Sequence, residues 1–284
     1  MSFWIVQTLN GITFGMVLFL IAAGLSLIFG LMRVINLAHG CFYLLGAYVA
    51  LSVIQYTNYF FLALVSGMLA ITIVGIAMHR FFLHRFQNDH QSQVLVTLAF
   101  VFIFSDLALV IWGGDPNLLP NPSLFDGSFS LGDIIFPIYR LVIIVIGVLV
   151  GIALWLFQER TRLGALIRAG VDDTEMARGL GINVPLLFTC IFGMGAAISA
   201  FGGVIAGPFI GVYPGLEWGI LLLAMAVLLI GGLGSLKGAF VGSLIVGLAD
   251  NFGKVLIPEL ALFPIFGSVV VVLAFRPSGL FGKL

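Results

Sequence analysis

Apolar residues follow one another in long runs along most of this chain, and short polar segments separate the runs. A membrane-spanning helix needs about 20 mostly apolar residues, and several runs approach or exceed that length. We place the spans at residues 8–29, 41–57, 59–78, 94–113, 138–157, 185–206, 218–236, 238–256 and 259–275. The last run is short and contains Pro264, so we expect a kinked or tilted helix there.

This pattern predicts an all-α polytopic membrane protein with about eight or nine transmembrane helices, one of which could be re-entrant. Residues 1–284 then form a single transmembrane domain. The least certain boundary is the one near Lys237, between two neighbouring runs.

Composition supports a membrane protein, because 61% of the 284 residues are apolar and only 8% are charged. Soluble domains are about 45–50% apolar and about 25% charged. The formal net charge is zero, which excludes a basic surface for nucleic acid. The 36 glycines suit close helix packing in lipid, where small residues let backbones approach one another.

The Lys and Arg residues predict an orientation, since they are enriched in cytoplasmic loops. Of the 12 basic residues, all but Arg140 and Lys254 fall in segments on one side of the predicted spans. The N-terminus is therefore expected in the periplasm and the C-terminus in the cytoplasm of a bacterial inner membrane. No basic residue precedes Arg33, so we interpret the first run as a retained span rather than a signal peptide.

Two loops are long. The expected periplasmic loop, 114–137, contains Pro116, Pro120, Pro122 and Pro137 and no basic residue. It is typical of an ordered, non-helical cap. The expected cytoplasmic loop is 158–184.

The cytoplasmic loop 158–184 predicts one short capped helix at about 173–180, after a basic segment. Asp172 can cap its N-terminus, and Glu175 completes a capping-box-like pair three residues later. Gly181 is placed to end the helix. The spacing places three apolar side chains on one face, namely Met176, Ala177 and Leu180.

Two segments suggest an internal repeat. Residues 27–31 resemble residues 229–233, and each segment is followed by a Gly-containing stretch, at 39–42 and 237–240. Transporters are often built from duplicated halves. A chance likeness between Gly-rich apolar segments explains the same observation.

Four stretches together resemble one family. GLSLIFGLMRVINLAHGCFYLLGAYVA, residues 24–50, resembles the first signature of the branched-chain amino acid ABC permeases of the LivH type. LGALIRAGVDDTEMARGLGINV, residues 163–184, is similar to their cytoplasmic coupling loop. Residues 230–250 and 276–282 are similar to later signatures.

The resemblance implies a set of partners. A permease of this family pairs with a second homologous permease chain, or with a second copy of itself, within membrane lipid. Two cytoplasmic ABC ATPase subunits drive the pair, and a periplasmic binding protein delivers branched-chain or related amino acids. The chain departs from the family at Cys41, where many members have an acidic residue, at Lys237, where many have Pro, and at Asp250, where many have Glu. The substrate therefore stays open, with urea, short amides and aromatic-acid-related solutes as alternatives.

No motif for ATP hydrolysis or other catalysis is present in the sequence. A P-loop requires a Gly-Lys-Ser/Thr sequence, whereas Lys237 lies between Leu236 and Gly238. We therefore expect no enzyme activity and no cofactor in this chain, with ATP hydrolysis in partner subunits. Three histidines near one loop, His79, His84 and His90, favour a solvated inner loop over a metal site.

With the family in view, we expect the helix at 173–180 to dock in a groove on an ATPase subunit. Met176, Ala177 and Leu180 would be its anchors, and Gly181 would end it. Three charged residues would set its orientation, namely Arg168, Asp172 and Glu175. The alternative is a helix that lies on the membrane surface.

The segment from Arg33 to Gly40 is a candidate translocation path or gate. Gly40 permits a broken helix, and Asn36 and His39 could then line a path. The alternative is an interfacial turn, in which Arg33 reaches the headgroups and a backbone carbonyl satisfies His39.

Two acidic residues lie inside predicted spans, at Asp106 and Asp250. Such residues are costly in lipid and are functional candidates, and Asp250 is a further candidate for the translocation path or gate beside Asn36, His39 and Gly40. Either acid could instead simply accept hydrogen bonds from a neighbouring helix. The outer segment from Gly207 to Glu217 is a candidate surface for the binding protein, or a plain Gly- and Pro-rich connection.

These patterns favour a permease that moves a small amino acid by alternating access. The alternative is a stand-alone ion-coupled secondary transporter, which would need several charged pairs deep in its spans. A membrane enzyme would need polar residues clustered at one depth, which the sequence does not offer.

Overall fold

The computed structural model describes residues 2–32, 36–86, 89–131, 134–172 and 174–282, without the side chains of residues 31, 131, 171–172 and 174–175. It is an all-α polytopic membrane fold, apart from one small hairpin of strands. Each predicted run carries a helix. These helices are α1 (Ser2–Met32), α2 (His39–Thr57), α3 (Phe60–Phe81), α4 (His90–Trp112), α5 (Ile138–Arg160), α8 (Val184–Ile210), α9 (Leu216–Gly231), α10 (Leu236–Leu256) and α11 (Phe263–Phe275).

Within the described residues, seven of these helices are long and apolar enough to cross a membrane. The other two, α9 and α11, have 16 and 13 residues and are shorter than a full span. The predicted count of about eight or nine spans is therefore met only if the two short helices are included.

The boundary near Lys237 differs from the prediction. The predicted span 218–236 runs too far, because α9 ends at Gly231 and a turn follows. Gly232 has a φ of 102°, a backbone conformation that favours glycine. The hydroxyl of Ser235 then caps α10 by accepting a hydrogen bond from the Gly238 N–H at 3.0 Å.

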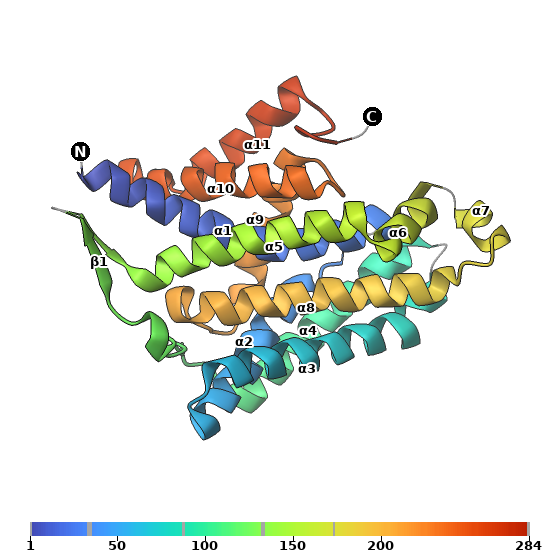
Figure 1. The fold of residues 1–284 in the computed structure, drawn as a ribbon, viewed down its shortest axis with the longest axis horizontal. Coiled ribbons are helices and arrows are strands. Elements are labelled where there is room, and N and C mark those ends of the chain that lie inside the picture. The colour runs from blue at the N-terminus through green and yellow to red at the C-terminus, as the bar shows by residue number, and fades with distance from the viewer. Residues whose placement is uncertain (1, 33–35, 87–88, 132–133, 173, 283–284) are drawn as a thin grey trace.

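The last run was expected to form a kinked or tilted helix, and α11 is tilted relative to α10 (Figure 1) but is not kinked at Pro264. Pro264 lies in the first turn of α11, where a helix needs no N–H donor, and a short 3-10 turn at Pro258–Leu260 precedes it. Proline therefore starts this helix and does not bend it.

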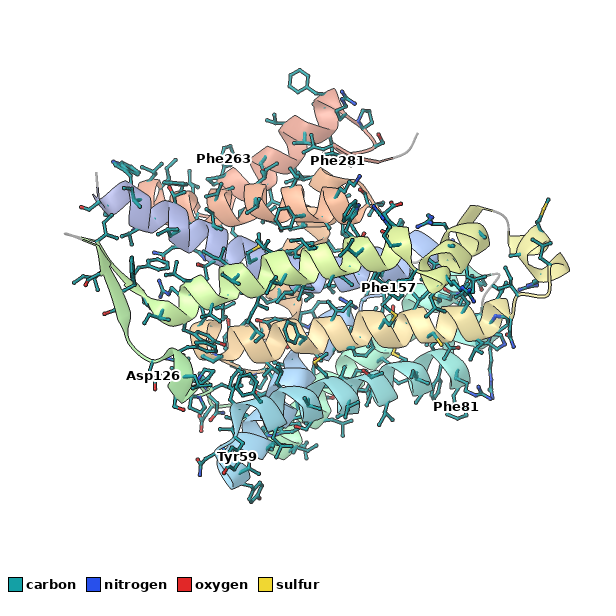
Figure 2. The ribbon with its side chains drawn as sticks, in the orientation of Figure 1. Tyr59, Phe81, Asp126, Phe157, Phe263 and Phe281 are labelled. Carbon is teal, nitrogen blue, oxygen red and sulfur yellow. The ribbon has the colours of Figure 1, made fainter. Side chains whose placement is uncertain are left out.

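The two ends of the bundle differ in their connections. Figure 2 shows Tyr59 and Asp126 at one end, and Phe81 and Phe157 toward the other. We call the first the loop end, because it carries the segment 114–137. We call the second the hairpin end, because it carries the helical hairpin of α6 (Arg162–Asp172) and α7 (Thr174–Gly179). The N-terminus lies at the loop end, and helices α6 and α7 project at the hairpin end (Figure 1).

The segment 114–137 contains more structure than a non-helical cap. A 3-10 turn spans Ser123–Phe125, and the strands β1 (Ser128–Leu131) and β2 (Ile134–Pro137) pair antiparallel. The strands were not predicted, because runs of four residues are too short for an alternating pattern to stand out from the flanking loop.

The segment 158–184 contains two helices where one was predicted. Helix α6 spans Arg162–Asp172 and helix α7 spans Thr174–Gly179. Asp172, the predicted cap, is therefore the last residue of α6, and its side chain lies outside the described residues. The basic residues at 160–168 concealed α6, whose apolar side chains Leu166 and Ile167 pack toward the bundle.

Helix α1 forms the centre of the bundle, and 83% of the residues in its most apolar stretch are buried. Small residues let its neighbours approach. A Cβ atom at Gly15 would lie 2.8 Å from the carbonyl oxygen of Ser243 on α10, and one at Gly247 would lie 2.5 Å from the carbonyl oxygen of Gly11. The glycines therefore set the spacing of α1 and α10, as expected for helices packed in lipid.

Helix α8 also packs through small residues, over about three and a half turns. Small residues occur at every fourth position, namely Gly195, Ser199, Gly203 and Gly207. A Cβ atom at Gly203 would collide with the carbonyl oxygen of Tyr43 on α2. This contact holds α2 against α8 at backbone distance, whereas Gly195 packs against α1 and Gly207 against Leu119.

The suspected repeat stays a hypothesis. Gly30 of the first segment lies beside Gly234, directly after the second, since a Cβ atom at Gly30 would lie 3.3 Å from the Cα atom of Gly234. Their packing differs, however. Helices α9 and α10 form a close hairpin at Gly231 and Gly238, whereas α1 and α2 make few contacts with each other.

Candidate translocation and coupling sites

Helix α2 begins deep inside the bundle. The Nε2 atom of His39, its first residue, lies 3.0 Å from the carbonyl oxygen of Ile21. Ile21 precedes the end of α1 at Met32 by eleven residues, which is about 16 Å along a helix axis. The hydroxyl of Ser199 on α8 donates to the His39 carbonyl oxygen at 3.0 Å. The start of α2 is thus held between α1 and α8 at membrane depth.

Side chains satisfy the non-helical backbone before α2. The Asn36 Oδ1 atom accepts from the Ala38 N–H at 3.1 Å, and the Thr97 hydroxyl of α4 accepts from the Leu37 N–H at 3.3 Å. Such backbone is tolerated at membrane depth only where protein or water satisfies it. Residue 33, and with it the expected role of Arg33, lies outside the described residues.

Two polar atoms in this region are buried without a described partner, namely Asn36 Nδ2 and His39 Nδ1. Gly40 is packed tightly, because a Cβ atom there would collide with the carbonyl oxygen of Glu217. The structure therefore brings the three predicted path residues together. It also confirms the contact of His39 with a backbone carbonyl, which belonged to the alternative interpretation.

A buried acid at Glu217 accompanies these residues. Glu217 is 2% exposed in the first turn of α9. Its carboxylate accepts from the Ser105 hydroxyl of α4 at 2.6 Å and from the Gly215 N–H at 2.9 Å. Sequence reasoning placed Glu217 in an outer connection and missed this site, although an acid at the start of an apolar helix was the available signal.

The two acids predicted inside spans have different surroundings. Asp250 is 5% exposed and pairs with Lys254, one turn along α10, at 2.7 Å. Its charge is therefore balanced within its own helix. Asp106 is exposed on α4 and forms no hydrogen bond or ion pair with the described residues. The alternative in which a neighbouring helix of this chain satisfies Asp106 is wrong.

Helix α6 is tied back to the end of α5. The Thr161 hydroxyl accepts from the Gly164 N–H at 3.0 Å. Arg168 donates to the Gln158 carbonyl oxygen and lies 3.9 Å from the Glu159 carboxylate. Arg168 was expected to orient a docked partner, and in this structure its guanidinium also fixes the base of the hairpin.

Helix α7 ends as predicted at Gly181, which has a φ of 81°. The Gly181 N–H donates to the Arg178 carbonyl, and the Ile182 N–H donates to the Ala177 carbonyl. This pair of bonds is a Schellman motif, which left-handed glycine permits. Helix α7 is therefore a defined element with a fixed end.

The predicted apolar face of α7 is only partly correct. Met176 and Leu180 are 63% and 76% exposed, whereas Ala177 is 2% exposed. Ala177 points toward the bundle, because α7 packs on both α6 and α8. The exposed anchors are thus Met176 and Leu180, and the side chains of Asp172 and Glu175 lie outside the described residues.

Two of the three histidines lie near each other, since the rings of His79 and His84 are 6.5 Å apart. His79 is buried, and its Nδ1 atom lies 2.9 Å from the Thr189 hydroxyl of α8. His90 starts α4, after Asp89, whose carboxylate caps that helix. The hydrogen bond from the Ser92 hydroxyl lowers the pKa of Asp89. Among the described residues, no three His, Cys, Asp or Glu side chains are grouped as metal ligands.

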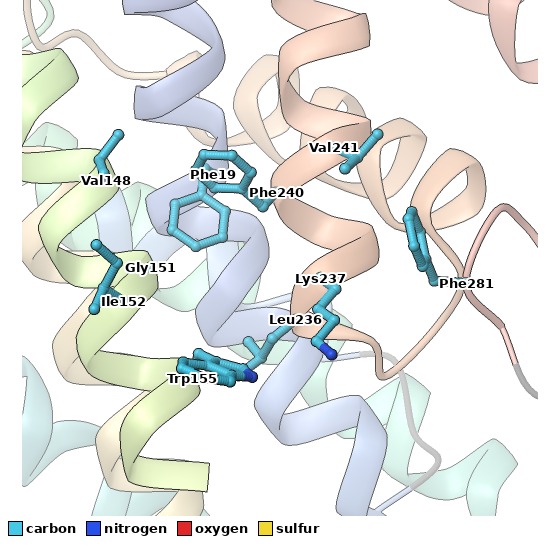
Figure 3. A pocket seen from close by; sticks show the side chains of 10 residues that line it. All are labelled: Phe19, Val148, Gly151, Ile152, Trp155, Leu236, Lys237, Phe240, Val241 and Phe281. Carbon is cyan, nitrogen blue, oxygen red and sulfur yellow. The ribbon is translucent and has the colours of Figure 1, made fainter. Parts of the chain in front are cut away.

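Two cavities lie away from the start of α2. One, of about 400 Å³, lies between α1, α5 and α10 and is almost wholly apolar, with Trp155, Lys237 and Phe281 near the hairpin end (Figure 3). The other, of about 410 Å³, lies at the loop end, between Asn117 and Tyr213. Asn36 and His39 line neither cavity, so neither is a path through the chain as it stands.

The loop-end cavity joins the two outer segments. Backbone bonds of 2.9 and 2.7 Å connect Asn117 with Val212. The predicted outer segment, from Gly207 to Glu217, therefore shares a surface with the segment 114–137 up to Tyr213, and then descends to the buried Glu217.

Comparison with known proteins places this arrangement among transport permeases. A family described as branched-chain amino acid transport system, permease component, matches residues 7–275. The permease protein BraD of Pseudomonas aeruginosa, named for high-affinity branched-chain amino acid transport, is 30% identical over 293 residues, which cover 98% of this chain and 95% of BraD.

The LivH permease protein of Escherichia coli K12, named for the same transport, is 30% identical over 299 residues, covering 99% of this chain and 96% of LivH. A fructose import permease protein of Rhizobium meliloti, FrcC, is 31% identical over 130 residues, covering 43% of this chain and 35% of FrcC. No solved structure matches the chain significantly.

Proposed function

This chain belongs to the family of permease components of branched-chain amino acid transport systems, and from that membership we propose that it is the permease subunit of an ATP-binding-cassette importer. It is a multi-pass membrane protein and a transport component. The proposal rests on the match along nearly the whole chain, together with a helical hairpin at one end whose helix α7 exposes two apolar side chains.

The proposed partners are a second permease chain, two cytoplasmic ATPase subunits and a periplasmic binding protein. The proposed cargo is a branched-chain or related amino acid. In this arrangement the hairpin end faces the cytoplasm and the loop end faces the periplasm. The grouping of charges supports that orientation, since Arg140 and Lys254 contact Asn10 and Phe14 of the first half of α1, toward the loop end.

The hairpin is the proposed contact with an ATPase subunit. Met176 and Leu180 would insert in a groove on that subunit, because both are apolar and exposed on a helix whose C-terminal end is fixed. Arg168 holds the base of the hairpin, so motion of the hairpin is transmitted to α5. Asp172, Glu175 and Gly181 remain proposed contributors to the same contact.

The broken start of α2 is the proposed gate region. Asn36, His39 and Gly40 lie where α1, α2, α4, α8 and α9 meet, with two buried polar atoms that lack a partner. Alternating access requires a place at which backbone and polar groups can exchange partners during a rearrangement. Asp250 is not part of this proposal, because its partner Lys254 satisfies it.

Reconstitution tests the proposed function. The tagged chain is purified in mild detergent with its associated subunits, which are identified by mass spectrometry, and the complex is placed in liposomes. We expect ATP-dependent uptake of radiolabelled leucine that requires the binding protein on the opposite side from the ATPases.

The matched control is the same liposome with a non-hydrolysable ATP analogue, in which uptake should cease. The proposal would be overturned if the chain purified alone and moved solute under an ion gradient without ATP. That result would favour a stand-alone ion-coupled secondary transporter.

A further inference from the structure

Three helices of the bundle are largely uncovered. In the most apolar stretch of each helix, only 22% of the residues of α3, 22% of those of α4 and 17% of those of α5 are buried. The uncovered faces of α3 and α5 are apolar, and lipid tails suit them as neighbours. Their exposed residues include Leu62, Val65, Leu69 and Ile73 on α3, and Val145, Val148, Leu149 and Ile152 on α5.

The uncovered face of α4 contains an acid. Ile103, Asp106 and Val110 follow one another at helical spacing, and all three are exposed. Asp106 precedes the end of α4 at Trp112 by six residues, which is about 9 Å along the helix. Its side chain is too short to reach the headgroups from that depth, unlike the long side chain of Lys237 near the start of α10.

An aspartate that faces lipid is unfavourable, by about 2.5–3.5 kcal/mol on insertion scales. The other acid in this region, Glu217, does not carry this cost. Glu217 accepts bonds from Ser105 and from the Gly215 N–H, so its carboxylate is satisfied inside the chain. Asp106 follows Ser105 directly, but its exposed side chain has no donor among the described residues.

Two exposed aromatic rings flank the acid. Phe102 lies one turn before Asp106 and is 57% exposed, and its ring lies 6.1 Å from that of Trp218, which is 41% exposed. Aromatic residues are enriched in the cores of protein interfaces. The α4 face thus combines apolar contact area, an aromatic pair and a carboxylate that requires a donor.

We propose that the second permease chain packs against the α4 face formed by Phe102, Ile103, Asp106, Val110 and Trp218. That chain, rather than lipid, meets the Asp106 carboxylate and brings a donor to it. The inference rests on the proposed function, because a second permease chain exists only in that setting.

Photocrosslinking tests the surface directly. A photoreactive phenylalanine analogue replaces Ile103 or Val110 on α4, and as matched controls Leu69 or Ile73 on α3. The full complex is irradiated in native membranes. We expect the two α4 positions to give adducts with another permease chain, identified by mass spectrometry, and the two α3 positions to give lipid adducts.

The inference is overturned if the α4 positions give only lipid adducts, or if the α3 positions capture the permease instead. In those cases a second permease chain still co-purifies and the proposed function stands. If no permease chain co-purifies and none of the four positions captures one, the proposed function itself has failed.

Substitution of the acid gives a second measurement. Asp106→Leu should reduce co-purification of the second permease roughly tenfold, while Asp106→Asn, which retains hydrogen-bonding atoms, should reduce it less. The thermal stability of the isolated chain should not fall in either variant. A lipid-facing Asp106 predicts the opposite, namely a more stable Asp106→Leu chain and unchanged co-purification.

Discussion

Glycines have opposite surroundings in the bundle core and in or directly after helix α7, at the tip of the α6–α7 hairpin. In the core, Gly203 and Gly247 lie against the backbone of a neighbouring helix, with no space for a Cβ atom. In the hairpin, Gly179 and Gly181 have no other atom within 4 Å of an added Cβ. The core is therefore held by contact between backbones, whereas the hairpin is held by hydrogen-bonded ends and a few side chains.

This difference suggests a division of labour. A core in which small residues fix helix spacing transmits displacement as a rigid body, because close-packed interiors deform little. A hairpin anchored mainly at its base can present Met176 and Leu180 to a partner without disturbing the core. Four substitutions test the comparison, in order of their expected effect on the stability of the isolated chain.

The largest loss of stability is expected from Gly203→Ala. The new methyl group would collide with the Tyr43 carbonyl oxygen, so α2 must move away from α8. Overpacking of this kind costs about 1–3 kcal/mol, and occasionally more. The measurement is the thermal aggregation midpoint of the detergent-purified chain, followed by size-exclusion chromatography.

The matched control is Gly219→Ala, in a helix position with nothing within 4 Å of the added Cβ. Alanine favours a helix over glycine by about 1 kcal/mol, so this variant should be as stable as the original chain or more so. Equal midpoints for the two variants would show that backbone contact does not hold the core.

Much of the fold could be predicted from the sequence, because long apolar runs indicate membrane spans and a high glycine content indicates close helix packing. The Gly181 stop was predicted for the same reason, since a left-handed helix end favours glycine. Helix α6 escaped prediction because its charged residues at 160–168 dominated the local pattern. The depth at which α2 begins could not be predicted, since it depends on contacts of His39 with Ile21 and Ser199.

The same limit applies to the acids. Asp106, Glu217 and Asp250 differ little in local sequence, yet one is exposed, one is satisfied by α4 and one pairs along its own helix. Ala177 shares the periodicity of Met176 and Leu180, but the packing of α7 on α8 turned it inward. Sequence spacing gives the face of a helix but not which neighbour covers it.

A smaller loss is expected from Glu217→Ala, which tests whether polar contacts contribute to the core beside the glycines. The substitution leaves the Ser105 hydroxyl and the Gly215 N–H without their acceptor, at about 1–3 kcal/mol. Glu217→Gln keeps an acceptor oxygen and should lose less. If Glu217→Ala were as stable as the original chain in the thermal assay, these bonds would contribute nothing to the core.

A still smaller effect on the bundle is expected from Gly164→Ala, at the junction of core and hairpin. Its methyl group would meet the carbonyl oxygens of Phe157 and Gln158, so α6 must tilt away from α5. We expect the rate of limited proteolysis in the hairpin to rise several-fold while the thermal midpoint changes little. Gly179→Ala is the control and should show neither change, and a fall of the midpoint in Gly164→Ala would mean that hairpin and core unfold together.

The smallest effect on stability, and the largest on transport, is expected from the double variant Met176→Ser and Leu180→Ser. Both side chains are mostly exposed, and substitutions at such positions usually change stability by less than about 0.5 kcal/mol. If these side chains anchor the hairpin in an ATPase groove, their loss should lower ATP-driven uptake in liposomes at least tenfold and release the ATPase subunits during purification.

The exposed Leu163 of α6 gives a control, since Leu163→Ser removes similar apolar surface from the same hairpin outside the proposed contact. Equal uptake by the double variant and the original chain would place the coupling contact elsewhere, whereas equal losses in the double variant and in Leu163→Ser would mean that the whole hairpin surface, rather than α7 alone, meets the ATPase.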